Sequence, residues 1–284
     1  MSISEADHQA RLRAEIVNAK DIPTIPALLV HILTVVDGER SSARELIEVI
    51  QRDQALTSRV LRLANSGFFA CQRQVATLPR AVILLGFSTI KNLALGVKIW
   101  DMLMVQGGAG LTELWEHSAL VAAAARLLAQ RTRAAEADEA FTAGLLHDIG
   151  RVVLMRRFPA VYGRLTSGGE GGLETRERAA FGVDHAQAGA WLFEAWALPA
   201  AIVESAARHH EPLPLDAPLG APTLVNVANR LVCWTNVAGE LAPGAEAELA
   251  TVAAVGLSLG DCAEIAAVLQ GQKDDVRRFY GGDA

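Results

Sequence analysis

Histidine is the residue type in this sequence best placed to do chemistry. Five of the seven histidines fall between Leu111 and Glu211, and one of them is followed directly by Asp148. Imidazole nitrogens and carboxylate oxygens bind iron, nickel, zinc or manganese, and helical bundles build such sites from facing helices. An aspartate can bridge two ions through its two oxygens. The pattern therefore predicts a divalent metal site formed by His117, His147, Asp148, His185, His209 and His210.

The surroundings of Asp148 favour this interpretation. The apolar pair Leu145-Leu146 precedes His147 and Asp148, so the carboxylate is expected to lie against a core. A buried charge is tolerated only where it is paired or bound to a metal. A structural polar network without metal meets the same requirement, and the sequence leaves that alternative open. His8 and His31 lie outside the cluster and are interpreted as hydrogen-bonded core residues.

The elements that must position these side chains are predicted to be helices. The chain is 51% hydrophobic and 20% charged, and its apolar residues recur at helical spacing rather than in alternation. We therefore expect an all-α multi-helix bundle. A glycine-rich stretch at 106–110 is the best candidate for an internal boundary. It divides a helical lead-in (1–20) and an N-terminal helical half (21–105) from a histidine-bearing helical half (111–237), which two C-terminal helices (245–284) follow.

Individual helices follow from apolar periodicity and from capping residues. In the histidine-bearing half they are expected over 111–131, 137–157, 186–196, 199–209 and 221–237. In the N-terminal half, Asn65 is expected to cap a helix, and Phe68 and Phe69 are expected to enter the core.

Bulk properties exclude several classes of function. The net charge is −6 and no strongly basic run occurs, which argues against direct binding of nucleic acid. The polar N-terminus lacks the apolar core of a secretion signal, and no stretch is long enough to span a bilayer, so a cytoplasmic protein is expected. The cysteines Cys71, Cys233 and Cys262 are far apart and are interpreted as reduced, buried thiols.

Several segments together resemble a known family. The segment Leu145–Gly150 (LLHDIG) resembles the His-Asp motif of the HD superfamily of helical metal-dependent phosphohydrolases, and the spaced histidines resemble its HD-GYP branch. The N-terminal half instead resembles the HDOD family of bacterial signalling proteins. The segments that carry this second resemblance are Ile22–Pro26 (IPTIP), Asp53–Thr57 (DQALT), Val60–Ser66 (VLRLANS) and Ala81–Gly86 (AVILLG). The likeness covers roughly residues 20–235.

The resemblance implies roles for particular residues. The six residues of the predicted metal site match ligand positions of the phosphohydrolases, and Asn229 stands where a seventh ligand, an aspartate, is expected. An amide oxygen can coordinate but carries no charge, so Asn229 is expected to be a weak ligand. Arg151 matches a phosphate-contacting lysine, with a solvated helix residue as the alternative.

Two functions are compatible with this resemblance. HDOD members are generally regulatory modules, which implies a signalling protein as partner and a retained metal pocket. The alternative is an active metal-dependent phosphohydrolase with His147, Asp148 and Arg151 in catalysis and a nucleotide or phosphate ligand. The Gly-Tyr-Pro signature of cyclic di-GMP phosphodiesterases is missing after His210, where Glu211 and Pro212 follow. This absence, together with Asn229, favours the regulatory function.

Overall fold

The computed structural model describes residues 5–18, 23–35, 40–69, 74–104, 110–168, 172–213, 218–235 and 250–280. Within these ranges every regular element is a helix and no strand occurs, which confirms the all-α prediction. No described helix is both long and apolar enough to cross a membrane. The predicted boundary at 106–110 lies almost entirely outside the described residues.

The N-terminal half consists of short helices that surround one longer helix. Their bounds are α2 Ala27–Thr34, α3 Arg40–Gln51, α4 Gln54–Ala64, α5 Leu78–Leu85 and α6 Phe87–Met104. Local sequence explains several of the ends. Asp53 accepts a bond from the Leu56 amide at the start of α4, and Thr77 accepts one from the Arg80 amide at the start of α5. Asn65 ends α4 and donates to the Leu61 carbonyl, as the sequence predicted.

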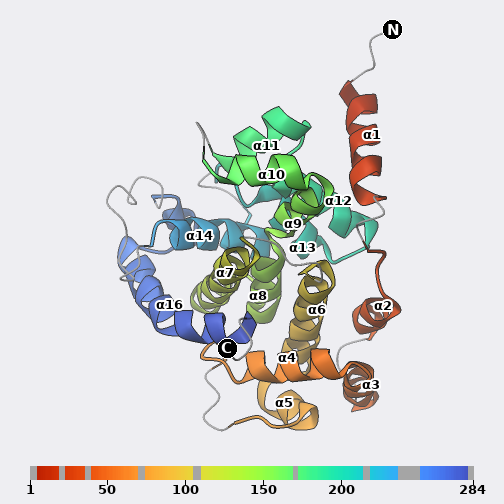
Figure 1. Cartoon of the computed structure of the whole chain (residues 1–284). Coiled ribbons are helices and arrows are strands. Elements are labelled where there is room, and N and C mark those ends of the chain that lie inside the picture. Colours follow the sequence, from red (N-terminus) through yellow and green to blue (C-terminus); the bar gives the residue numbers. More distant parts are fainter. Residues whose placement is uncertain are drawn as a thin grey trace.

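The histidine-bearing half forms the centre of the molecule. Its helices are α7 Leu111–Thr132, α8 Ala137–Leu146, α9 Ile149–Arg157, α10 Pro159–Thr166, α11 Leu173–Phe181, α12 His185–Ala195, α13 Ala200–Arg208 and α14 Ala221–Cys233. Helices α7 and α8 pack against each other in the middle of the fold (Figure 1). The short 3-10 helix η1 Ala250–Val255 contacts α14, α16 Leu259–Tyr280 lies along α7, and α1 Glu5–Val17 packs on α12.

The main departure from the predicted helices is at the His-Asp pair. The expected single helix over 137–157 is broken into α8 and α9, with His147 and Asp148 between them. Nothing in the local sequence stops a helix there, because the stretch contains no proline and its only glycines are Gly144 and Gly150. The break is stabilised by contacts with other helices, which local periodicity cannot reveal.

The core residues of both halves belong to one continuous cluster. Phe68 is buried, while Phe69 is only partly buried and packs 5.4 Å from the Phe141 ring, so the core prediction is correct for the first and too strong for the second. His31 was expected in the core but is partly exposed and bonds Glu45 at 2.8 Å, because α2 lies at the surface beside α3.

The predicted burial of the cysteines is correct for one of the two described thiols. Cys262 is fully buried, whereas Cys233 is exposed in the last turn of α14, and both are free thiols. Cys71, and the side chain of His8, lie outside what the structure describes.

Candidate metal centre

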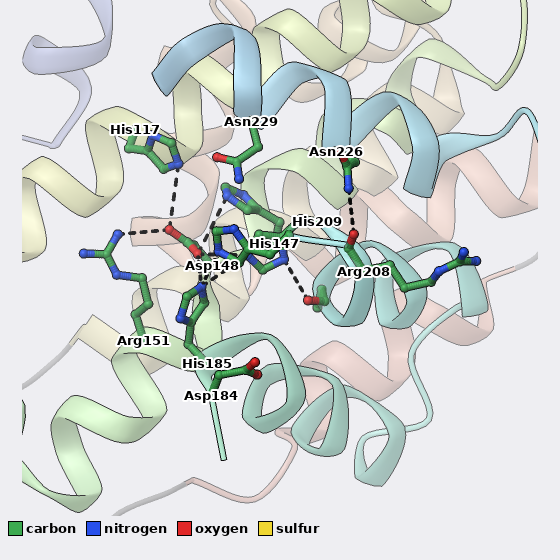
Figure 2. A network of polar contacts seen from close by, with 12 residues as sticks. His117, His147, Asp148, Arg151, Asp184, His185, Arg208, His209, Asn226 and Asn229 are labelled. Carbon is green, nitrogen blue, oxygen red and sulfur yellow. Dashed lines mark hydrogen bonds and ion pairs between the residues drawn. The ribbon is translucent and has the colours of Figure 1, made fainter. Parts of the chain in front are cut away.

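The break between α8 and α9 turns the Asp148 carboxylate toward the histidines. Asp148 has φ −98° and ψ 9°, in the sparsely occupied bridge region where many active-site residues lie. It occupies the N-cap position of α9 but accepts no capping bond from that helix. Its oxygens face four imidazoles and one guanidinium instead (Figure 2).

Close packing of α9 on α12 brings His185 to this carboxylate. A Cβ atom at Gly150 would lie 1.8 Å from the His185 carbonyl oxygen and 2.7 Å from the Gly189 amide nitrogen, both backbone atoms that cannot yield. Asp184 caps α12 by accepting a bond from the Gln187 amide at 2.9 Å, so His185 is the first residue of that helix. Only glycine at position 150 permits this approach.

Asp148, His185, His209 and His210 form the first of two ligand groups, which we call the three-histidine group. The His185 Nε2 lies 3.3 Å from Asp148 Oδ1, 3.2 Å from His209 Nε2 and 2.9 Å from His210 Nε2. The His209 Nε2 lies 3.4 Å from the same oxygen. These spacings suit a shared ion, because donors about 2.1 Å from one ion lie about 3.0–3.4 Å from each other in octahedral or tetrahedral geometry.

The outer nitrogens of two of these rings are fixed by the protein. The His185 Nδ1 lies 2.5 Å from the Glu177 Oε2, and the His209 Nδ1 lies 2.8 Å from the Ala206 carbonyl oxygen. A carbonyl oxygen only accepts, so His209 carries a ring hydrogen on Nδ1, and its Nε2 is the nitrogen that faces Asp148. Such outer partners hold metal-binding histidines in the correct tautomer.

His117, His147 and Asp148 form the second group, which we call the two-histidine group. The His117 Nε2 lies 3.8 Å from Asp148 Oδ2, and the His147 Nε2 lies 3.8 Å from Asp148 Oδ1. The His147 Nδ1 donates to the Gly144 carbonyl at 2.7 Å, and its buried Nε2 has no hydrogen-bond partner. An orphaned buried nitrogen aimed at a carboxylate fits a bound cation.

The two further predicted site residues also lie at this group. Asn229 comes from α14, and its side chain lies beside His117 (Figure 2). The Arg151 Nη1 lies 3.1 Å from Asp148 Oδ2. The side chain of Arg151 is 27% exposed, so it is an ion-pair partner of Asp148 rather than a fully solvated helix residue.

Burial and neighbouring charges set the protonation of the cluster. Burial lowers the pKa of His147 well below its ordinary value, and burial with the nearby His209 and His185 lowers the pKa of His210 to about 3. Burial raises the pKa of Asp148, but the positive Arg151 and hydrogen bonds from His185 and His209 outweigh it and hold that pKa well below the ordinary value. His147 and His210 are therefore neutral and Asp148 is charged at neutral pH, which are the forms that bind metal.

Two supporting residues were not predicted from the sequence. Glu177 on α11 is fully buried, accepts from the His185 backbone amide at 2.9 Å, and accepts from the Tyr162 hydroxyl at 2.9 Å. Asn226 on α14 donates to the carbonyl oxygens of Arg208 at 2.8 Å and Glu211 at 2.9 Å. These bonds fix the chain on both sides of His209 and His210, and Figure 2 shows the bond to Arg208.

Comparison with known proteins places this geometry in a family. The fold matches the crystal structure of a phosphohydrolase candidate from Shewanella amazonensis SB2B with a TM-score of 0.78 and 25% identity, covering 95% of this chain and 98% of that one. An HDOD domain protein of unknown function from Geobacter sulfurreducens matches with a TM-score of 0.75 and 24% identity, covering 96% and 97%. An uncharacterized protein of Treponema pallidum (strain Nichols) is 27% identical over 195 residues, which are 67% of this chain and only 38% of that protein. The HDOD domain pattern matches residues 22–212, and the chain belongs to the HDOD domain family.

Proposed function

We propose that this chain is a bacterial cytoplasmic signalling module that binds one or two divalent metal ions at Asp148 and acts by contacting another protein. The observation that carries the proposal is the convergence of the three-histidine group, with spacings of 2.9–3.4 Å between potential donor atoms. A purely structural polar network does not require so many imidazole nitrogens to face one another, because facing lone pairs repel and a single ring proton can lie between only one pair of them, whereas one cation can bind them all.

Two features support regulation rather than catalysis. Asn229 contributes no charge where the resemblance implies an aspartate, so the two-histidine group has Asp148 as its only carboxylate. Arg151, the residue suited to holding a phosphate, already pairs with Asp148. Exposed apolar side chains on α5, including Ile83 at 81% exposure, support the N-terminal half as the surface for protein contacts.

A metal-dependent phosphohydrolase is the second candidate function. It is supported by the six converging ligand residues and by the likeness to the Shewanella phosphohydrolase candidate. In this reaction His147 and Asp148 would hold the ion, and Arg151 would have to leave Asp148 to bind a phosphate oxygen. A bound ion would supply an activated water and stabilise developing charge.

The test combines metal analysis with a hydrolysis assay. Purified protein should carry iron, nickel, zinc or manganese, or take up added Mn²⁺, while hydrolysing cyclic di-GMP and simple phosphodiesters poorly. His147→Ala should lose metal, and His31→Ala, a histidine bonded to Glu45 outside the cluster, should not. Wild-type protein that takes up no metal contradicts the metal proposal. Robust hydrolysis that disappears in His147→Ala but persists in His31→Ala would replace the regulatory function with the enzymatic one.

A further inference from the structure

Trp100, four residues before the end of α6, connects the N-terminal half to the His-Asp break. It is fully buried, and its Nε1 donates to the Leu145 carbonyl oxygen at 2.7 Å. Leu145 lies in the last turn of α8, two residues before His147, where helix carbonyls lack partners within the helix. Trp100 therefore stabilises the end of the helix that delivers His147.

The same indole also contacts the segment that carries His117. Its ring packs against the buried Trp115 ring in an edge-to-face arrangement, with 5.2 Å between centroids and 89° between planes. Trp115 lies on α7, two residues before His117. One side chain from the N-terminal half thus touches both segments that supply imidazoles to the two-histidine group.

Helix α6 packs closely on α8 on one side and on helices of the N-terminal half on the other. A Cβ atom at Gly96, one turn before Trp100, would lie 2.9 Å from Leu145 Cδ2, so α6 and α8 approach closely there. On the other side, Lys98 donates to Asp53 at 2.5 Å, and α6 packs on α2, α4 and α5 (Figure 1). A displacement at the end of α8 therefore has a direct route into the N-terminal half.

We propose that Trp100 is a positioning residue that couples metal binding at the two-histidine group to the N-terminal half. The inference rests on the proposed metal binding. The Nε2 atoms of His117 and His147 each lie 3.8 Å from a carboxylate oxygen of Asp148, farther than the about 3.0–3.4 Å between neighbouring donors on one ion. Ion uptake draws these ligands inward and moves both segments that touch Trp100.

The first measurement is Mn²⁺ affinity in Trp100→Phe, which keeps an aromatic ring and loses the donor to Leu145. Calorimetric titration should show about tenfold lower Mn²⁺ affinity at the two-histidine group, which is the scale on which outer partners tune metal sites. The affinity of the three-histidine group should not change. The matched control is Trp196→Phe. That buried tryptophan ends α12 at the opposite end from His185 and packs against Phe193. The control should leave both affinities unchanged.

The second measurement separates coupling from plain stability. Saturating Mn²⁺ should slow amide exchange in α4 and α6 of the wild type and of Trp196→Phe, but not in Trp100→Phe. Wild-type protein that binds no Mn²⁺ overturns the proposed metal function itself. Wild-type binding with Trp100→Phe indistinguishable from Trp196→Phe in affinity and exchange overturns the coupling alone.

A second variant tests the inference if Trp100→Phe folds poorly. Gly96→Ala perturbs the same α6–α8 contact and should give smaller changes in Mn²⁺ affinity and amide exchange in the same direction. Affinity and exchange like those of the wild type in Gly96→Ala would contradict the inference.

Discussion

The two ligand groups share Asp148 but differ in how completely the protein prepares them. In the three-histidine group, His185 and His209 lie 3.3 and 3.4 Å from Asp148 Oδ1, and outer partners fix both rings. In the two-histidine group both imidazoles lie 3.8 Å from the carboxylate, and Arg151 occupies the Oδ2 oxygen that faces His117. The first group is nearly in binding geometry, and the second is not.

The two groups also differ in the negative charge that the protein places beside them. The three-histidine group is supported from behind by Glu177, a second buried carboxylate that increases the electron donation of His185. The two-histidine group has the neutral Asn229 instead. A divalent ion needs anionic ligands for neutralisation, so we expect a tight ion in the first group and a weak ion in the second. The predictions below are ordered by their expected effect on this difference.

Asp148→Ala should have the largest effect because both groups lose their shared ligand. Metal content should fall to background, and removal of a buried, ion-paired carboxylate should cost about 3–5 kcal/mol of unfolding free energy. Elemental analysis and thermal melts with and without chelator measure the two effects. Asp261→Ala, which removes an exposed partner of Arg131, is the control and should retain metal. An Asp148→Ala protein that melts like the parent under both conditions would indicate an empty pocket.

Glu177→Gln should weaken only the three-histidine group. The substitution keeps the shape of the side chain and removes the charge behind His185, which should reduce affinity for the tighter ion about 10–100-fold. Tyr162→Phe removes only the hydroxyl that donates to Glu177 and should have a smaller effect in the same direction. Mn²⁺ titration distinguishes the sites. Equal weakening of both ions would mean that Glu177 supports the fold in general and not this group.

Much of the candidate site could be predicted from the sequence, because the side chains that converge there are histidines and one aspartate in a recognisable motif. The supporting residues could not. Glu177 lies in the sequence Leu173–Phe181 (LETRERAAF), which reads as a polar exposed segment, and it is buried only because α11 packs beside α10 and α12. The break at His147 and Asp148 was missed for a related reason. It depends on contacts from α6 and α12, whereas helix periodicity reports only on neighbours along the chain.

The metal-free protein should lose stability with rising pH while its metal affinity increases. Burial lowers the pKa of His185, but bonds to Asp148 and Glu177 outweigh burial and raise that pKa to about 9 from 6.5. The folded state therefore holds this proton more tightly than the unfolded chain, so the stabilisation is complete below pH 6.5 and is lost as pH rises through about 9.

An incoming ion must displace the same proton. Affinity of the tighter site should therefore rise about tenfold per pH unit over this window and then level off. Thermal melts in chelator and Mn²⁺ titrations at pH 6.5, 7.5 and 9 test both slopes. Melts that do not change over this range would show that His185 carries no extra proton in the metal-free protein.

Asn229→Asp should have the smallest effect and should act on the two-histidine group alone. Asn229 is buried on α14 beside His117, and its Oδ1 lies 3.7 Å from the Cys233 Sγ. A carboxylate in the same position adds the missing negative charge without changing the size of the side chain, so the weaker ion should bind a few-fold to about tenfold more tightly.

Asn226→Asp is the matched control, because Asn226 lies on the same helix but donates to backbone carbonyls, a role that a carboxylate cannot fill. It should destabilise the His209–His210 segment and weaken the tighter ion instead. Mn²⁺ titration of both variants, with a phosphodiesterase assay alongside, shows whether charge at position 229 limits the second ion. If Asn229→Asp leaves the weaker ion unchanged, the difference between the groups arises from the 3.8 Å ligand spacing and the Arg151 ion pair rather than from the missing carboxylate.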